Sequence, residues 1–275
     1  MTEKVAAIQM ASGPNVGANL IEAGRLIKQA VDAGAKLIVL PENFAIMGLK
    51  ESDKVDAREE EGKGKIQDFL AQTSVKHKIW IVAGTIPLAS SDPKKVKAAC
   101  LLYNDKGNVV ARYDKIHLFD VSIEETGEKY NESATIEAGS ETVVVDTPFG
   151  KLGLAICYDL RFPELFREMV DKGVEIIAMP SAFTAITGKA HWKALIRARA
   201  IENLSYVIAA AQGGFHVNGR ETHGNSMIVD PWGNVLNILQ QGSGAVVADI
   251  DRDKLLRTRQ NFPALKHRML GVRPS

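Results

Sequence analysis

The chain has 275 residues, a formal net charge of +1, 45% hydrophobic residues and 24% charged residues. This composition is that of ordinary soluble domains and excludes a disordered, collagen-like or coiled-coil protein. The near-neutral charge argues against nucleic-acid binding, which needs a concentrated basic face. No apolar run approaches the ~18 residues that a transmembrane helix needs, so we expect neither a nucleic acid nor a membrane as partner.

Strand-length apolar runs alternate with helical patterns along the chain. Residues 37–40 are continuously apolar, which indicates a strand buried on both faces, and residues 104–107 favour a hairpin turn. In chain order the predicted elements are strand 5–9, helix 19–34, strand 37–40, helix 65–75, strand 79–86, a hairpin of strands 98–103 and 109–113, a hairpin of strands 142–146 and 152–156, helix 163–172, strand 174–179, helix 191–203, strands 206–211, 226–229 and 245–250, and helix 253–259.

This mixture of βα alternation and hairpins predicts an α/β fold with a mixed sheet or two sheets. About ten strands are many for one open sheet, which favours two packed sheets covered by helices. The chain contains no Pro/Gly/Ser-rich linker, compositional break or repeat. We therefore expect a single domain over residues 1–275, with a core at about 4–260 and an irregular basic tail at 261–275.

The N-terminal segment lacks the long apolar stretch and cleavage site of a secretory signal. Cys100 and Cys157 are the only cysteines, so a disulfide framework or a Cys-x-x-Cys metal site is not expected. The six histidines show no paired ligand spacing either. The sequence predicts a cytoplasmic protein that uses no metal and no organic cofactor.

Three polar residues follow predicted strands, where α/β proteins bind their ligands. Glu42 follows residues 37–40, Lys115 follows strand 109–113, and Cys157 lies between strand 152–156 and a helix. Singly, each has a structural explanation: a solvated glutamate, a surface lysine and a core cysteine. Together they provide a base, a cation for an oxyanion and a nucleophile, the set that acyl transfer requires. The start of the following helix would favour the Cys157 thiolate.

The sequences around these residues resemble the three signature segments of the nitrilase superfamily of carbon–nitrogen hydrolases, in the same order. They are Pro-Glu-Asn-Phe at 41–44, Asp-Lys-Ile-His-Leu-Phe-Asp at 114–120 and Cys-Tyr-Asp-Leu-Arg-Phe-Pro-Glu at 157–164. The similarity extends from Val5 to about Arg268. The resemblance implies a four-layer αββα sandwich, a homodimer or higher homo-oligomer formed through the helical face near the nucleophile, and a Glu42–Lys115–Cys157 catalytic triad.

The resemblance also implies a second glutamate that positions the lysine. Glu132 is the best match, although Glu124, Glu125 and Glu128 lie in the same loop. In the implied mechanism the glutamate accepts the thiol proton, the thiol attacks the carbonyl carbon, and the lysine with the backbone N–H of Tyr158 stabilises the oxyanion. Water then hydrolyses the acyl thioester.

Several short segments of the sequence resemble the Nit branch of this superfamily. Arg161 is the candidate cation for a substrate carboxylate, with a salt bridge to a neighbouring acid as the alternative. Phe183 and Thr187 match pocket-lining positions of the branch. Arg197 and Arg199 are expected on a solvated helix face, and Trp192 and Trp232 in the core.

Two Nit activities compete for the function. The segments 210–214 and 220–226 resemble the amidase that splits deaminated glutathione into 2-oxoglutarate and Cys-Gly, and we expect residues 216–225 to form a wall for the Cys-Gly half. The alternative is the ω-amidase that acts on 2-oxoglutaramate, or another amidase, nitrilase or carbamoyl hydrolase of the superfamily. A non-catalytic binding or scaffold protein is the alternative from a different class, and an intact Glu–Lys–Cys set argues against it.

Overall fold

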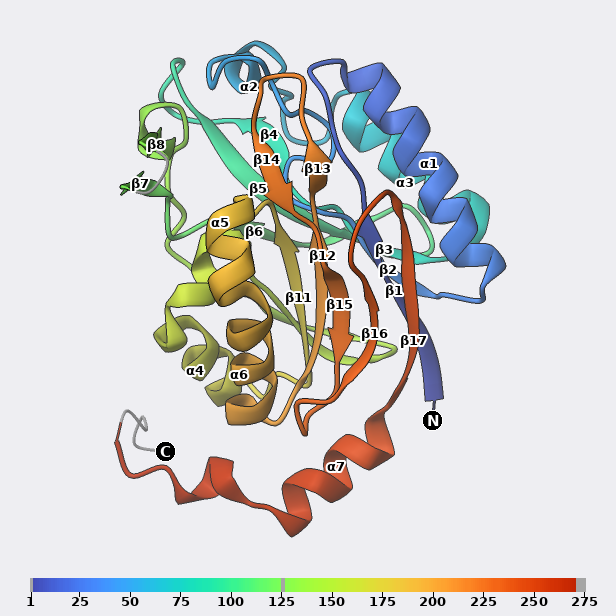
Figure 1. Ribbon diagram of the computed structural model, residues 1–275. Coiled ribbons are helices and arrows are strands. Elements are labelled where there is room, and N and C mark those ends of the chain that lie inside the picture. Colours follow the sequence, from blue (N-terminus) through green and yellow to red (C-terminus); the bar gives the residue numbers. More distant parts are fainter. Residues whose placement is uncertain (1, 125–126, 271–275) are drawn as a thin grey trace.

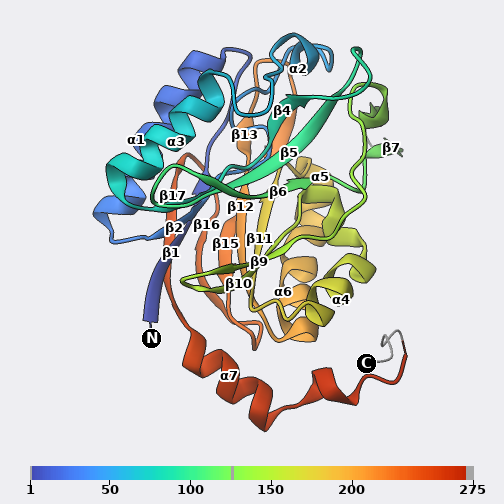
Figure 2. The same ribbon diagram turned by 180° about the vertical axis from the view of Figure 1, so that it is seen from behind.

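The computed structural model describes residues 2–124 and 127–270, and it contains two large β-sheets that face each other between two layers of helices (Figures 1 and 2). The first sheet contains β1 (Thr2–Gln9), β2 (Leu37–Val39), β3 (Trp80–Val82), β4 (Ile86–Ala89), β5 (Val96–Tyr103), β6 (Val109–Asp114) and β17 (Gly244–Asp251). The second contains β9 (Val144–Thr147), β10 (Gly150–Leu154), β11 (Ile176–Ser181), β12 (Tyr206–Ala211), β15 (Ser226–Val229) and β16 (Val235–Leu239).

Helices and short hairpins complete the fold. Two small two-stranded sheets pair β7 (Asp120–Ile123) with β8 (Glu128–Asn131) and β13 (Gly213–Phe215) with β14 (Glu221–His223). The helices are α1 (Val16–Asp32), α2 (Asp53–Asp56), α3 (Lys65–His77), α4 (Pro163–Asp171), α5 (Ala185–Thr187), α6 (Lys193–Asn203) and α7 (Arg252–Asn261), with 3₁₀ turns η1 (Glu132–Ala134), η2 (Cys157–Arg161) and η4 (Ala264–His267) and the π-helical turn η3 (Gly188–Trp192).

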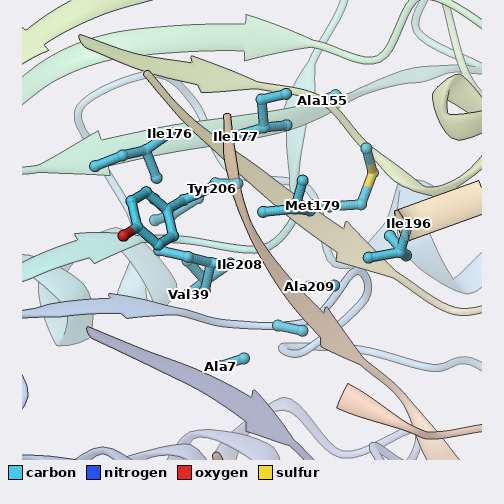
Figure 3. Packing of buried hydrophobic residues seen from close by; sticks show 14 of the residues in the cluster. Ala7, Val39, Ala155, Ile176, Ile177, Met179, Ile196, Tyr206, Ile208 and Ala209 are labelled. Carbon is cyan, nitrogen blue, oxygen red and sulfur yellow. The ribbon is translucent and has the colours of Figure 1, made fainter. Parts of the chain in front are cut away.

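Alternating side chains of the first sheet create the four layers. In β1, Val5 and Ala7 belong to the core between the sheets, whereas Ala6 and Ile8 pack with α1 and α3. Successive side chains of a strand point to opposite faces, so a continuously apolar strand must be covered on both sides. Figure 3 shows the inter-sheet core, with Val39 from one sheet and Tyr206 and Ile208 from the other.

The second sheet has its helices on the opposite outer face. α4 contributes Phe166 and Met169 to the core, and α6 contributes Ile196 and Ala200. α4 and α6 lie on the other side of the molecule from α1 and α3 (Figures 1 and 2). This is the αββα sandwich expected from the family resemblance.

Most predicted elements are confirmed, with shifts of a few residues at their ends. The single strand expected at 79–86 is instead two strands, β3 and β4, because the chain turns at Gly84, whose φ is +57°. The short elements α2, β7, β8, β13, β14 and β16 were not predicted, since they lack a periodic apolar pattern. The expected irregular tail contains η4, and its residues 271–275 lie outside the described part of the chain.

Two predictions about single residues are wrong. Trp232 is 57% exposed rather than part of the core, whereas Trp192 is fully buried as expected. Arg199 is buried rather than solvated, because its Nε and Nη2 donate to Leu160 O at 3.0 and 2.8 Å and its guanidinium lies over Phe166. Arg199 therefore supports the turn that begins at Cys157. Among the described residues, no helix combines the length and apolarity needed to cross a membrane.

The parallel strands bring three segments to one end of the sandwich. β1, β2 and β3 run parallel to one another, as do β10, β11 and β12. Glu42 follows β2, Cys157 follows β10, and Ala182 follows β11. Because parallel strands end at the same edge of a sheet, ligands bind at this edge, and the fold places the candidate residues there.

The turn at Gly84 tests how tightly the Glu42 segment is packed. A Cβ at Gly84 would lie 2.1 Å from Pro41 O, whereas a Cβ at Gly62, which also has a positive φ of +78°, would meet nothing within 4 Å. We expect Gly62→Ala to cost about 1–2 kcal/mol from the left-handed backbone alone, and Gly84→Ala to cost at least about 3 kcal/mol because the clash adds to that strain. Urea unfolding measures both values, and equal costs would contradict this packing.

Candidate functional site

The candidate residues line one pocket at the strand ends. The pocket is lined by Glu42, Asn43, Glu51, Lys54, Lys115, Phe119, Tyr130, Asn131, Glu132, Cys157, Tyr158, Arg161, Ala182, Phe183, Thr184, Thr187 and Arg220. The eight residues given catalytic or substrate-binding roles from the sequence are all in this set, whereas Arg220 is the one residue of the wall expected at 216–225 that lines this pocket.

Glu42 is held by its backbone on both sides. Gln212 Nε2 donates to Glu42 O at 2.9 Å, and the backbone N–H of Asn43 donates to Thr85 Oγ1 at 2.8 Å. Asn43 has a φ of +57°, the left-handed conformation that asparagine tolerates better than most residues. The turn after β2 therefore directs the Glu42 carboxylate into the pocket rather than to solvent.

Lys115 lies at the centre of the site. Its side chain is only 1% exposed, and its Nζ donates to Glu42 Oε1 at 2.7 Å and to Glu132 Oε1 and Oε2 at 2.9 and 2.8 Å. Its backbone is fixed too, since its N–H donates to Ala98 O and its carbonyl accepts from Gly139 N. Three distant segments thus meet around one ammonium group.

Burial and charge act in opposite directions on this cluster. Burial alone would lower the pKa of Lys115, but the carboxylates of Glu132 and Glu42 outweigh it and raise that pKa well above its usual value. Burial would likewise raise the pKa of Glu132, yet Lys115 lowers it below the ordinary value. The lysine is therefore an ammonium ion and Glu132 a carboxylate over the whole neutral range.

Glu132 is the loop acid that contacts the lysine. Besides its bonds to Nζ, Glu132 Oε2 accepts the backbone N–H of Phe119 at 2.6 Å, which ties η1 to the segment after Lys115. Glu124 instead lines a neighbouring groove, and Glu128 begins β8. Glu125, the remaining alternative, lies outside the described residues.

Cys157 occupies a strained backbone position. Its φ is +47°, a conformation that costs a non-glycine residue about 1–3 kcal/mol. The Sγ atom is 3.5 Å from the backbone N–H of Ala182, which donates to it. The sharp turn directs the thiol out of the end of β10 and into the pocket, beside Glu42 and Lys115.

The thiol is not a resting thiolate, contrary to the expectation from the helix start. Burial and the negative charge of Glu42 raise the pKa of Cys157 well above its usual value, and Lys115 only partly offsets them. The predicted helix effect is weak here because α4 begins only at Pro163, after the short turn η2. A base is therefore needed to remove the thiol proton, and Glu42 is the adjacent carboxylate.

Asp159 joins the Cys157 turn to the Lys115 segment. This fully buried carboxylate accepts the N–H of Ile156 at 2.8 Å and the hydroxyl of Tyr113 at 2.7 Å. It also accepts the backbone N–H of His117 at 3.1 Å and contacts His117 Nδ1 at 2.7 Å. Tyr113 and His117 lie two residues on either side of Lys115, so one carboxylate fixes the lysine relative to the thiol.

The candidate substrate-binding residues lie together beyond the thiol. The guanidinium of Arg161 lies 5.2 Å from the ring centroid of Phe183 and 5.8 Å from that of Tyr158, and its Nη1 is 3.2 Å from His191 Nδ1. Thr187, the last residue of α5, lines the same pocket. No carboxylate in the described part of the chain pairs with Arg161, which argues against the salt-bridge alternative.

Sequence reasoning missed several functional candidates. Asp159 was not singled out, although a buried acid two residues after the nucleophile in an apolar stretch is a usable signal. Glu51, Lys54 and Tyr130 also line the pocket without having been named, and Phe119 was named only within the second signature segment. They come from irregular segments and from short elements, for which periodicity gives no signal. Arg220 was included only within a longer segment.

The Asp159 cluster predicts separable effects of two conservative substitutions. Asp159→Asn removes an acceptor from a buried site with four donor contacts, and we expect about 2–4 kcal/mol lower stability and slower alkylation of Cys157 by iodoacetamide. Tyr113→Phe removes one donor and leaves no unpaired group, so it should cost only about 1 kcal/mol. Urea unfolding and alkylation rates measure both. Equal behaviour of the two variants would contradict a role for Asp159 in joining the segments.

Comparison with known proteins places this site in a family. The carbon-nitrogen hydrolase family matches residues 4–260. A Synechocystis sp. protein named deaminated glutathione amidase is 44% identical over 267 residues, which cover 96% of this chain and 97% of that protein.

Two solved structures share the fold over nearly the whole chain. The C. elegans NitFhit protein superimposes with a TM-score of 0.89 at 36% identity over 98% of this chain, which spans 65% of that longer protein. Saccharomyces cerevisiae Nit3, described as a member of branch 10 of the nitrilase superfamily, has a TM-score of 0.86 at 31% identity over 95% of this chain and 94% of its own. This chain therefore belongs to the carbon-nitrogen hydrolase family and is a hydrolase of carbon–nitrogen bonds other than peptide bonds.

Proposed function

We propose that this protein is a thiol-dependent amidase that hydrolyses deaminated glutathione to 2-oxoglutarate and Cys-Gly. The observation that carries the reaction class is the buried ammonium of Lys115 held between Glu42 and Glu132 beside Cys157. The substrate is supported by the near-full-length relative named for this activity and by Arg161, a pocket cation that pairs with no carboxylate among the described residues.

The proposed acylation step uses the thiol and its neighbouring base. Glu42 accepts the thiol proton as Cys157 Sγ attacks the amide carbon. Lys115 and the backbone N–H of Tyr158 stabilise the oxyanion that forms. The Glu42 carboxylic acid then gives its proton to the amide nitrogen, the C–N bond breaks, and the amine leaves. The acyl group remains on sulfur as a thioester.

Deacylation repeats the same chemistry with water. Glu42 accepts a proton from water as the oxygen attacks the thioester carbon, and the oxyanion forms against Lys115 again. The thiolate then leaves and takes the proton from Glu42, which restores the resting thiol. In this scheme Lys115 never loses its proton, in keeping with a pKa held high by two carboxylates.

The acyl half is placed by its free carboxylate. Arg161 offers a planar guanidinium suited to a carboxylate, and Phe183 and Tyr158 hold it by their ring faces. Thr187 completes this wall of the pocket. The carboxylate of a 2-oxoglutaryl group would thus be bound while its distant carbonyl carbon faces Cys157.

We further propose a cytoplasmic homodimer. Ile201, Trp232 and Phe262 are apolar side chains about half exposed on or near the helical face, where a second copy would cover them. Sedimentation of the purified chain at the monomer mass would contradict the dimer. Recovery of the protein from the exported fraction of cells would contradict the cytoplasmic location.

The substrate is tested by comparing kcat/KM for deaminated glutathione and 2-oxoglutaramate. We expect deaminated glutathione to be the better substrate. Cys157→Ala should remain folded and lose roughly a thousandfold or more in kcat. Arg161→Ala should lose about thirtyfold or more in kcat/KM. A higher value for 2-oxoglutaramate would indicate an ω-amidase. Cys157→Ala activity within about tenfold of the parent would exclude this nucleophile.

Glu42→Gln tests the base through the thiol itself. We expect kcat to fall by about 10²–10⁴, since general base catalysis is removed. The pKa of Cys157 should fall at the same time, because the negative charge of Glu42 raises it and Lys115 stays positive. The pH dependence of thiolate absorbance, with Cys157→Ala as the blank, measures this shift. A pKa that rises or stays unchanged would contradict the proposed placement of Glu42.

A further inference from the structure

We propose that Arg220 binds a carboxylate on the amine half of the substrate, so that the pocket selects amides with a carboxylate on each side of the scissile bond. This inference rests on the proposed function, because it assigns the two halves of that substrate to two walls of the pocket. Arg161 then holds the acyl carboxylate and Arg220 the carboxylate of the departing amine.

Arg220 is a cation with unused hydrogen-bonding capacity. Its Nη2 donates to Ala182 O at 3.1 Å, and its guanidinium lies 5.0 Å from the ring centroid of Tyr130. Its Nε is buried and has no hydrogen-bond partner, and within residues 2–124 and 127–270 no carboxylate forms an ion pair with it. Since guanidinium carries five N–H donors and keeps its charge, an anionic ligand would complete these interactions.

Glu51 interacts with the charge of Arg220, but it has a closer cationic partner of its own. Glu51 and Lys54 line the same pocket, but they pair with each other at 3.0 Å. Lys54 is the main reason that the pKa of Glu51 lies below its usual value, with a smaller effect from Arg220. That pair is neutral as a unit, so the positive charge of Arg220 remains available to a substrate in the pocket.

The position of Arg220 indicates which half of the substrate it meets. In the proposed reaction Glu42 protonates the departing nitrogen, so the amine half lies on the Glu42 side of the thiol. The β13–β14 hairpin that carries Arg220 is bonded to this side: Asn218 Nδ2 donates to Gly48 O at 2.8 Å, and Gln212, just before β13, donates to Glu42 O. Both views place this hairpin beside α2, which follows the Glu42 segment (Figures 1 and 2).

Arg161 is carried by a different segment of the site. It ends η2, the turn that Cys157 begins, and it contacts His191 in η3. From there a second groove continues along Ile186 and Thr187. The two guanidinium groups therefore come from different segments, the Cys157 turn and the β13–β14 hairpin. Both reach the segment after β11, where Arg220 donates to Ala182 O and Arg161 lies over Phe183.

A substrate that lacks only one charge tests this assignment. The probes are deaminated glutathione and its C-terminal carboxamide, which differ only at the carboxylate of the amine half. We expect the parent enzyme to prefer the free acid by at least about tenfold in kcat/KM. Arg220→Gln should reduce this preference to within about threefold. Arg161→Gln should lower kcat/KM for both probes and keep the preference.

The ratio of the two rates is insensitive to the fraction of each variant that folds, since both probes see the same preparation. Arg58→Gln is the matched control: Arg58 is exposed and donates to the backbone of Val55, outside the pocket, and it should keep the parent ratio. If Arg220→Gln keeps the preference, Arg220 does not bind this carboxylate, and if Arg161→Gln abolishes it, the two halves are reversed. If the parent enzyme hydrolyses neither probe, the proposed function is wrong. If the parent hydrolyses both probes and Arg220→Gln keeps the preference, only the role of Arg220 is contradicted.

Discussion

The buried ammonium group of Lys115 organises the site. A lysine that is 1% exposed is stable in the interior only if carboxylates compensate its charge. Glu42 and Glu132 supply that charge from segments 73 and 17 residues away in sequence. Burial of either carboxylate without the lysine would be unfavourable. The three groups therefore stabilise one another only in the assembled fold. The constraint that keeps the lysine charged also keeps it in place for the oxyanion of the proposed reaction.

The Cys157 turn has a strained backbone that is stabilised by contacts with other residues. Cys157 holds a φ of +47°, and its turn is fixed at its start by Asp159 and at its end by Arg199, which donates twice to Leu160 O. These interactions are buried, so their hydrogen bonds contribute more than they would at the surface. Strained residues concentrate at functional sites and persist only when their surroundings determine them fully. Here the buried hydrogen bonds from Arg199 of α6 help to maintain the strained backbone conformation of Cys157.

Charge distribution gives the pocket its chemical preference. The Glu42, Lys115 and Glu132 cluster carries a net negative charge, which on its own would repel an anionic substrate. Arg161 and Arg220 add positive charge on the walls around it, and aromatic rings hold both guanidinium groups. The site thus combines an anionic reaction centre with cationic walls, an arrangement suited to an amide whose ends are carboxylates and whose middle reacts.

Most of the framework and the reaction class could be predicted from the sequence. Apolar runs such as 37–40 determine strands covered on both faces, and the order of the Glu42, Lys115 and Cys157 segments indicated a carbon–nitrogen hydrolase before any geometry was known. These features are local, since periodicity and motifs are read within about ten residues.

What only the tertiary structure decided is how distant polar groups share their contacts. It distinguished Glu132 from Glu124 and Glu128 through its bonds to Lys115, buried Arg199 against the Cys157 turn, and left Arg220 in the pocket wall without a carboxylate partner among the described residues. It also showed that the helix start does not determine the protonation of Cys157, because burial and Glu42 raise the pKa of the thiol and Lys115 offsets them only in part. Hydrogen bonds, burial and electrostatic balance depend on which segments meet in space, and sequence spacing does not encode those distances.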